Sequence, residues 1–170
     1  MGKGKSIVKV SPTSLEKVNK QISIVEKILS KRQGRILAKI GTPKVDLDEV
    51  RVLPTRSTPE VILVPDGIIK IRGRSIPEDA LRFFKPIQEW INIYIENPAD
   101  VTCVDILLEF LNGVSKKILV QLLQKITYVK LKHKKFIINW YYENGDDNSL
   151  QIGEDMAEVL DVPFNFIKIT

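Results

Sequence analysis

Few side chains of this 170-residue chain have the chemistry for catalysis or metal binding. Its one histidine, His133, stands among lysines, and its one cysteine, Cys103, stands in an apolar run. One histidine and one cysteine cannot build a zinc site, and the acidic segment with Glu143, Asp146 and Asp147 lacks the spacing of an EF-hand loop. The sequence also lacks the phosphate-binding pattern GxxxxGKS/T and the dinucleotide pattern GxGxxG. We therefore expect a protein that is not an enzyme and that binds no cofactor and no metal.

The segment best suited to a regulatory role is the turn 111–117, which joins an apolar strand to a helix. A helix N-terminus offers free backbone N–H groups and the positive end of the helix dipole, which together favour an anion such as a phosphate. Ser115 is the one hydroxyl in this turn, and a phosphate on it would add about two negative charges. Lys116 and Lys117 add positive charge beside it.

Two interpretations of this turn stay open. In the first, Arg72 and Arg74, at the end of a preceding hairpin, join the turn to form a basic corner for a phosphate or a partner. In the second, the residues have only structural roles. Ser115 is then the helix N-cap, Asn112 and Gly113 form the turn, and the two lysines face solvent.

Hydrophobic spacing predicts the elements that hold this turn in place. The runs Val61–Val64 and Ile68–Ile71 flank Pro65, Asp66 and Gly67, which is typical of a β-hairpin. The remaining expected elements are strands at 102–111, 136–142 and 163–169, and helices that begin near Ser75, Ser115 and Ser149, the first with a kink or a restart at Pro86. The order β-β-α-β-α-β-α-β, with room for a short extra strand first, predicts a small α/β (α+β) domain with a mixed sheet flanked by helices.

The charge is unevenly distributed and suggests two parts. Residues 1–50 hold 11 Lys and Arg against 5 Asp and Glu, whereas residues 51–170 hold 15 against 16. Within the basic extension 1–50, an amphipathic helix is expected at about 13–33. Its apolar seam consists of Leu15, Val18, Ile22, Val25 and Leu29. This seam must pack against the domain 51–170, a second copy of the chain, or a partner, so self-association is one open possibility.

Composition and segment lengths limit the cellular setting and the alternatives. No apolar run reaches the roughly 18–20 residues of a membrane span, and no signal-peptide pattern is visible. With a single cysteine, these features favour a cytoplasmic protein without a membrane partner. The basic charge of the extension is either the solvated face of its helix or, in an alternative function, a surface that binds nucleic acid or an acidic partner. Residues 1–50 contain no Phe, Tyr or Trp for base stacking, which makes nucleic acid the weaker alternative.

An ordered series of short motifs runs through residues 54–168. The motifs are Ser57-Thr-Pro59, Pro65-Asp-Gly67, Gly73-Arg-Ser-Ile-Pro-Glu-Asp79, Phe83-Phe84 with Pro86, Trp90-Ile91, Tyr94, Leu108-Glu-Phe-Leu-Asn112, Lys117, Trp140-Tyr-Tyr142, Gly153-Glu154 and Pro163-Phe164. The series resembles the SiaC-type regulatory phosphoprotein family, formerly a domain of unknown function. The resemblance implies a fold similar to anti-sigma-factor antagonist (STAS-like) domains.

The resemblance also implies a function. Members of this bacterial family act as non-enzymatic signalling adaptors in a kinase and phosphatase partner-switching module. A dedicated protein kinase phosphorylates a Ser or Thr in the strand-to-helix turn, and a PP2C-type phosphatase removes the phosphate. The unphosphorylated form binds and activates a diguanylate cyclase, so the expected output is cyclic-di-GMP signalling and biofilm behaviour through protein binding.

The chain departs from the family pattern at the phosphate acceptor. The family has Ser or Thr directly after the Asn, whereas here Gly113 follows Asn112. Three interpretations follow. Phosphorylation has moved to Ser115, or the protein is a locked binder that cannot be phosphorylated and always binds its partner, or the family mechanism is lost. We favour the locked binder, because glycine cannot carry a phosphate. The expected partner-binding residues are Asn112, Gly113, Lys116, Lys117, Arg72, Arg74, Ser75 and Glu78.

Overall fold

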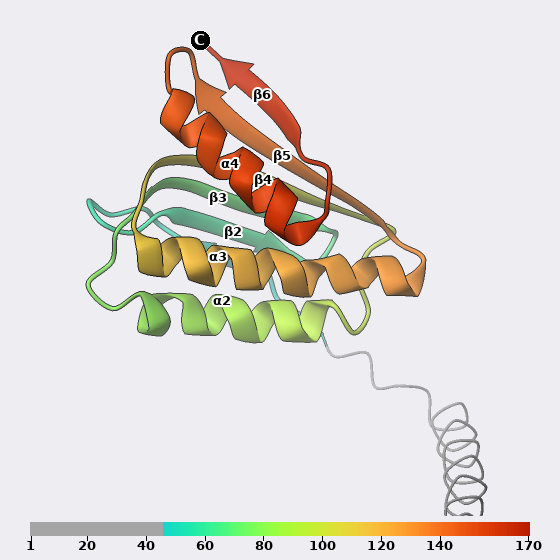
Figure 1. Cartoon of the computed structure of the whole chain (residues 1–170). Coiled ribbons are helices and arrows are strands. Elements are labelled where there is room, and N and C mark those ends of the chain that lie inside the picture. Colours follow the sequence, from blue (N-terminus) through green and yellow to red (C-terminus); the bar gives the residue numbers. More distant parts are fainter. Residues whose placement is uncertain (1–45) are drawn as a thin grey trace, which may run out of the picture. The chain divides into compact units, whose positions relative to one another are not determined.

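A six-stranded mixed sheet forms the centre of the fold (Figure 1). The computed structural model describes residues 46–170, and the strands lie side by side in chain order. They are β1 (Val50–Val52), β2 (Glu60–Val64), β3 (Ile68–Ser75), β4 (Val101–Leu111), β5 (Lys135–Glu143) and β6 (Asn165–Ile169). Strands β1 to β3 pair antiparallel, whereas β3 to β6 pair parallel. The predicted mixed sheet is confirmed, with its hairpin and its short first strand.

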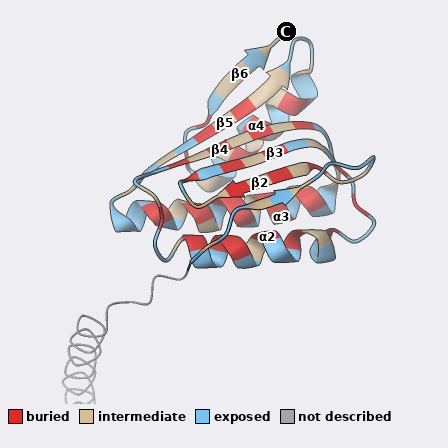
Figure 2. Cartoon of the chain, turned by 180° about the vertical axis from the view of Figure 1, so that it is seen from behind, coloured by how far each residue is buried: buried red, intermediate tan, exposed pale blue. Residues whose placement is uncertain are grey.

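Three helices connect the parallel strands and cover one face of the sheet (Figures 1 and 2). They are α2 (Ala80–Tyr94), α3 (Gly113–Ile126), which continues into the short 3-10 helix η1 (Thr127–Lys132), and α4 (Asp147–Leu160). Each parallel strand lies next to the previous one in the same direction, so crossovers of one hand place all three helices on the same side. Among these helices of residues 46–170, none combines the length and the apolar character that a membrane span requires.

Alternating side chains of the central strands build the core between the sheet and the helices. Val104, Ile106, Ile138 and Trp140 point to the helices and are almost fully buried. The indole Nε1 of Trp140 donates a hydrogen bond to the carbonyl of Ser149, at 3.0 Å. This polar end of the ring is satisfied in the core, as buried tryptophans require.

Helix α4 approaches this indole very closely. A β-carbon built on Gly153 would lie 2.8 Å from three ring atoms of Trp140. Glycine is therefore needed at this position for α4 to pack against β5. The fold thus fixes α4 relative to the sheet through the pair of Gly153 and Trp140.

Several predicted helix starts are wrong by a few residues. Ser75 does not cap a helix but is the last residue of β3, and the N-cap of α2 is Asp79, whose carboxylate accepts from the Arg82 N–H at 2.9 Å. Helix α4 likewise begins at Asp147, capped by Asp146, before the expected Ser149. Asp is as good a cap as Ser, so the choice between neighbouring caps depends on where the preceding strand ends.

Of the kink or restart expected at Pro86, the restart does not occur, because α2 runs unbroken from Ala80 to Tyr94. Proline removes one backbone hydrogen bond from the helix. Phe84 and Ile87 are nevertheless buried in the core on either side of it. Packing of this face against the sheet outweighs the lost bond, since tertiary contacts override local propensity.

Some predictions fall on residues that the structure does not describe. They concern the part of the basic extension 1–50 that precedes residue 46. They are the helix at about 13–33, self-association through the seam Leu15, Val18, Ile22, Val25 and Leu29, and the binding of nucleic acid or an acidic surface. All of these lie outside the described residues and stay predictions. The described residues, Asp46–Thr170, form one compact unit.

Candidate functional site: the turn at the carboxyl edge of the sheet

The turn between β4 and α3 is held by three hydrogen bonds of Asn112. Its side-chain Oδ1 accepts from the Ser115 N–H at 2.8 Å, which makes Asn112 the N-cap of α3. Its carbonyl accepts from the Lys116 N–H at 2.8 Å, and its own N–H donates to the Ser75 carbonyl at 3.1 Å. Ser115 is thus the third residue of the helix and not its cap, which corrects the structural interpretation of the turn. The turn is fastened both to its helix and to the end of β3.

Gly113 is the first residue of α3 and is exposed to solvent. A β-carbon built there would meet nothing within 4 Å among the described residues. A side chain at this position would therefore have room, and it would lie beside the N–H groups of the first helical turn that have no intrahelical partner. The neighbouring Val114 is also exposed, at 55%. The turn is accessible from outside the domain.

Ser115 lies inside the protein. Its exposed fraction is 0%, and its hydroxyl has no hydrogen-bond partner among residues 46–170. A kinase must reach the hydroxyl oxygen of its acceptor, and this oxygen lies below the surface in the described conformation. The geometry thus gives no support to the interpretation that phosphorylation has moved to Ser115.

The cations expected around the turn are partly neutralised by acidic residues. Lys116 Nζ lies 3.3 Å from Asp155 Oδ2 of α4, and Arg74 Nε lies 3.2 Å from Glu109 Oε2. The Arg74 guanidinium also lies 4.8 Å from the centre of the Phe110 ring. These ion pairs make the corner less basic than the sequence suggested. Each acidic partner lies more than thirty residues from its cation along the chain, so the pairing is not visible in the sequence.

The hydrogen bonds at Asp155 also affect its ionisation. A hydrogen bond from Gln151 and the contact with Lys116 hold the pKa of the Asp155 carboxyl below its usual value. Both partners favour the charged carboxylate. The ion pair between α3 and α4 is therefore formed at neutral pH.

The other predicted partner-binding residues have different environments. Lys117 is exposed on α3, and Glu78 is exposed in the segment before α2. Ser75 is buried, with an exposed fraction of 1%, so it supports the turn through its carbonyl and presents no side chain to a partner. Arg72 is exposed on β3, opposite Leu107 of β4. The structure brings Ser75 and Asn112 together, whereas it records no contact of Glu78 with the turn.

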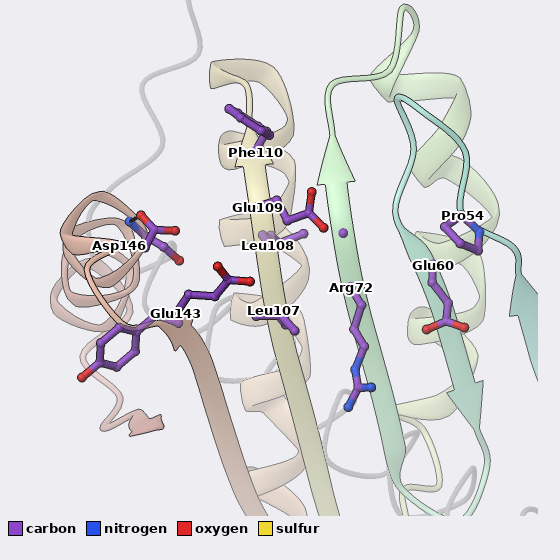
Figure 3. A pocket seen from close by; sticks show the side chains of 12 residues that line it. Pro54, Glu60, Arg72, Leu107, Leu108, Glu109, Phe110, Glu143 and Asp146 are labelled. Atoms are coloured by element: carbon purple, nitrogen blue, oxygen red, sulfur yellow. Dashed lines mark hydrogen bonds between the residues drawn. The ribbon is translucent and has the colours of Figure 1, made fainter. Parts of the chain in front are cut away.

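A groove lies next to the turn, and the sequence did not predict it. It has a volume of about 630 Å³ and lies over the ends of β3, β4 and β5 (Figure 3). Its lining residues are Pro54, Glu60, Arg72, Gly73, Leu107, Leu108, Glu109, Phe110, Tyr142, Glu143, Asp146 and Ser149. One signal in the sequence was available: Phe110 is an aromatic residue at the end of a strand, directly before the turn.

The histidine and the cysteine lie away from the turn. His133 is exposed at the end of η1 with a left-handed backbone, φ 58°. Cys103 is half-buried near the start of β4, where burial and the nearby Asp105 raise the pKa of its thiol. Neither residue contributes to the site at the carboxyl edge.

Comparisons with known proteins agree with the motif series. The chain is similar to SiaC of Pseudomonas aeruginosa in a complex with the diguanylate cyclase SiaD, in which SiaC is described as the activator of SiaD. The TM-score is 0.66 with 20% sequence identity, and the match covers 71% of this chain and 99% of the other. For SiaC of Pseudomonas aeruginosa alone the TM-score is 0.62, with 21% identity over 72% of this chain and 98% of the other.

A curated relative and a family model extend these matches. An uncharacterised protein of Pseudomonas aeruginosa is 21% identical over 121 residues, which cover 69% of this chain and 94% of that protein. The structural matches establish the shared fold, including the mixed sheet with three helices. The model of the SiaC family regulatory phosphoproteins matches residues 52–169, and this chain belongs to that family.

Proposed function

We propose that this protein is a non-enzymatic signalling adaptor that binds and activates a diguanylate cyclase through the surface around the turn 111–117. Membership in a family of regulatory phosphoproteins supports this proposal, as does the similarity to a SiaC protein described as the activator of a diguanylate cyclase. The exposed Gly113, Val114 and Lys117 offer a surface on a rigid turn. Such a cyclase works on a cytoplasmic nucleotide, so the proposal includes a cytoplasmic location.

We further propose that the protein is a locked binder, which stays competent to bind whatever the kinase and the phosphatase do. The observation that carries this proposal is Gly113, an exposed residue without a hydroxyl at the first position of α3. The buried hydroxyl of Ser115 adds support, because it is not presented to a kinase. In this proposal the kinase and the PP2C-type phosphatase of the module act only on relatives that carry Ser or Thr after the Asn.

Co-purification tests the proposal. The full chain is used as bait for the diguanylate cyclases of its own organism, and the bound cyclase is identified by mass spectrometry. The turn variant Val114→Arg adds a long charged side chain to the exposed surface and is expected to remove the cyclase. Val159→Arg, at an exposed position of α4, is the matched control and is expected to retain it. Equal cyclase recovery with both variants would contradict binding through the turn.

A further inference from the structure

The groove beside the turn lies where β4 and β5 part, since Tyr142 and Glu143 of β5 pair with β6 and not with β4. Strand β5 pairs with β4 only as far as Leu107 opposite Tyr141, whereas β3 pairs with β4 up to Leu111. Residues 108–111 therefore have no strand partner on the β5 side within the described sheet. A second hollow continues the groove between these residues and the first turn of α4. We call the combined space the β4 groove, and its open strand edge leads directly into the turn at Asn112.

Acidic side chains dominate the β4 groove. Its lining includes one cation, Arg72, and four carboxylates. Glu109 pairs with Arg74 and Asp146 caps α4, which leaves Glu60 and Glu143. Figure 3 shows the Glu109 and Glu143 carboxylates on the two sides of β4. Among residues 46–170, Glu60 and Glu143 form no ion pair within 4.0 Å. A concave surface with an excess of one charge attracts the opposite charge.

An exposed aromatic ring stands at the end of the groove. Phe110 has an exposed fraction of 56%, and the Arg74 guanidinium lies over its ring. Aromatic rings of this kind are common anchors in protein interfaces. Among residues 46–170, no three acidic, His or Cys side chains lie together as a group that could hold a metal ion.

These features together identify the kind of occupant. We propose that the β4 groove binds an extended, basic segment of a protein partner. Where the segment runs beside Glu143, its backbone would add to the open edge of β4, as in other cases of strand addition. Its Lys or Arg side chains would pair with the Glu143 carboxylate there and, where the segment crosses β3, with the Glu60 carboxylate. This inference rests on the proposed function, because the groove is continuous with the turn surface. It adds the chemistry of the partner segment that would bind there.

A peptide titration tests the charge and the strand edge separately. The full chain is titrated against a fluorescein-labelled peptide of alternating arginine and leucine, and anisotropy is read at low and at moderate salt. The groove variant Glu60→Gln with Glu143→Gln is expected to bind about tenfold more weakly, equivalent to about 1.4 kcal/mol. The control Glu89→Gln with Glu158→Gln has the same net charge and changes two exposed helical positions outside the groove, so it is expected to bind as the wild type does.

Two altered peptides complete the experiment. A peptide in which every backbone nitrogen is methylated keeps its charge but has no N–H to donate to a strand on either edge, and we expect it to bind more weakly. A peptide with glutamate in place of arginine is expected not to bind. Equal weakening of peptide binding by the groove and control variants would indicate unspecific charge attraction and would overturn the inference. An anisotropy change that is fully explained by concentration-dependent self-association of the chain would also overturn it. Thermal unfolding of the groove variant confirms that it is folded.

The same variants separate this inference from the proposed function. If the groove variant still co-purifies with the cyclase while Val114→Arg does not, the β4 groove is not the partner site and the adaptor function stands. If the peptide binds in the groove but no cyclase is recovered with the wild type, the proposed function fails and the basic-segment site stands.

Discussion

Asn112 links the start of α3 to the end of β3, because its backbone N–H donates a hydrogen bond to the Ser75 carbonyl at 3.1 Å. Its side chain caps the helix at the same time. The position of Gly113 relative to the sheet is therefore set by two elements. A partner that binds this surface meets a preformed turn, which lowers the entropy cost of association.

Removal of the cap is expected to lower stability. Asn112→Ala deletes the acceptor of the Ser115 N–H, and loss of such a cap costs about 1 kcal/mol. Urea unfolding followed by circular dichroism measures the change. Asn112→Asp keeps a capping oxygen and should unfold close to the wild-type midpoint. Equal destabilisation by both substitutions would show that the capping bond does not support the turn.

Restoring a hydroxyl should restore phosphorylation. Gly113→Ser and Gly113→Thr place a hydroxyl at an exposed helix start with free space around it. We expect both variants to fold normally and to gain one phosphate from the kinase of the module, whereas the wild type gains none. The intact mass of each protein, measured after incubation with kinase and ATP, shows whether one phosphate has been added. Phosphopeptide mapping that finds Ser115 labelled in the wild type would contradict the locked binder.

The close approach of α4 to Trp140 predicts a large effect of one methyl group. Gly153→Ala puts a β-carbon 2.8 Å from the indole ring, so helix and ring must move apart. Overpacking of this kind costs about 1–3 kcal/mol. Gly113→Ala is the matched control, since its β-carbon meets nothing within 4 Å among the described residues. Similar urea midpoints for the two variants would contradict the tight packing.

The ion pair between α3 and α4 predicts a specific pH dependence. The pKa of Asp155 is lower in the folded protein than its ordinary value of 3.8, so its contribution is complete above about pH 4 and is lost as the pH falls through the folded-state pKa. Asp155→Asn should therefore be less stable than the wild type at pH 7 and equally stable at strongly acidic pH. Denaturant midpoints across this range measure the difference. A difference that does not change with pH would exclude the ionised carboxylate as its source.

Local patterns were sufficient to predict most of the fold. The Pro65-Asp-Gly turn between β-branched runs and the apolar spacing in α2 and α3 are encoded by neighbouring residues, and these elements formed, the two helices with shifted first residues. The caps were predicted less well, because Ser75 and Asp79 are both suitable and differ little in intrinsic preference. The end of β3, which is set by pairing with β4, decides between them.

The candidate site could be predicted only in part. The turn at Asn112 and Gly113 follows from the sequence and the resemblance. The burial of Ser115, the pairing of Lys116 with Asp155 and the β4 groove depend on contacts between distant segments. The groove in particular lies where β5 leaves β4 and pairs with β6 alone, which no local pattern encodes.

The central claim is that the protein activates a diguanylate cyclase regardless of the kinase. Its most direct test measures cyclic-di-GMP formed by the co-purified cyclase when the wild type or Gly113→Thr is added, before and after treatment with kinase and ATP. We predict equal activation by the wild type in both cases and a loss of activation by treated Gly113→Thr. A wild-type protein that loses its activating effect after kinase treatment would contradict the claim.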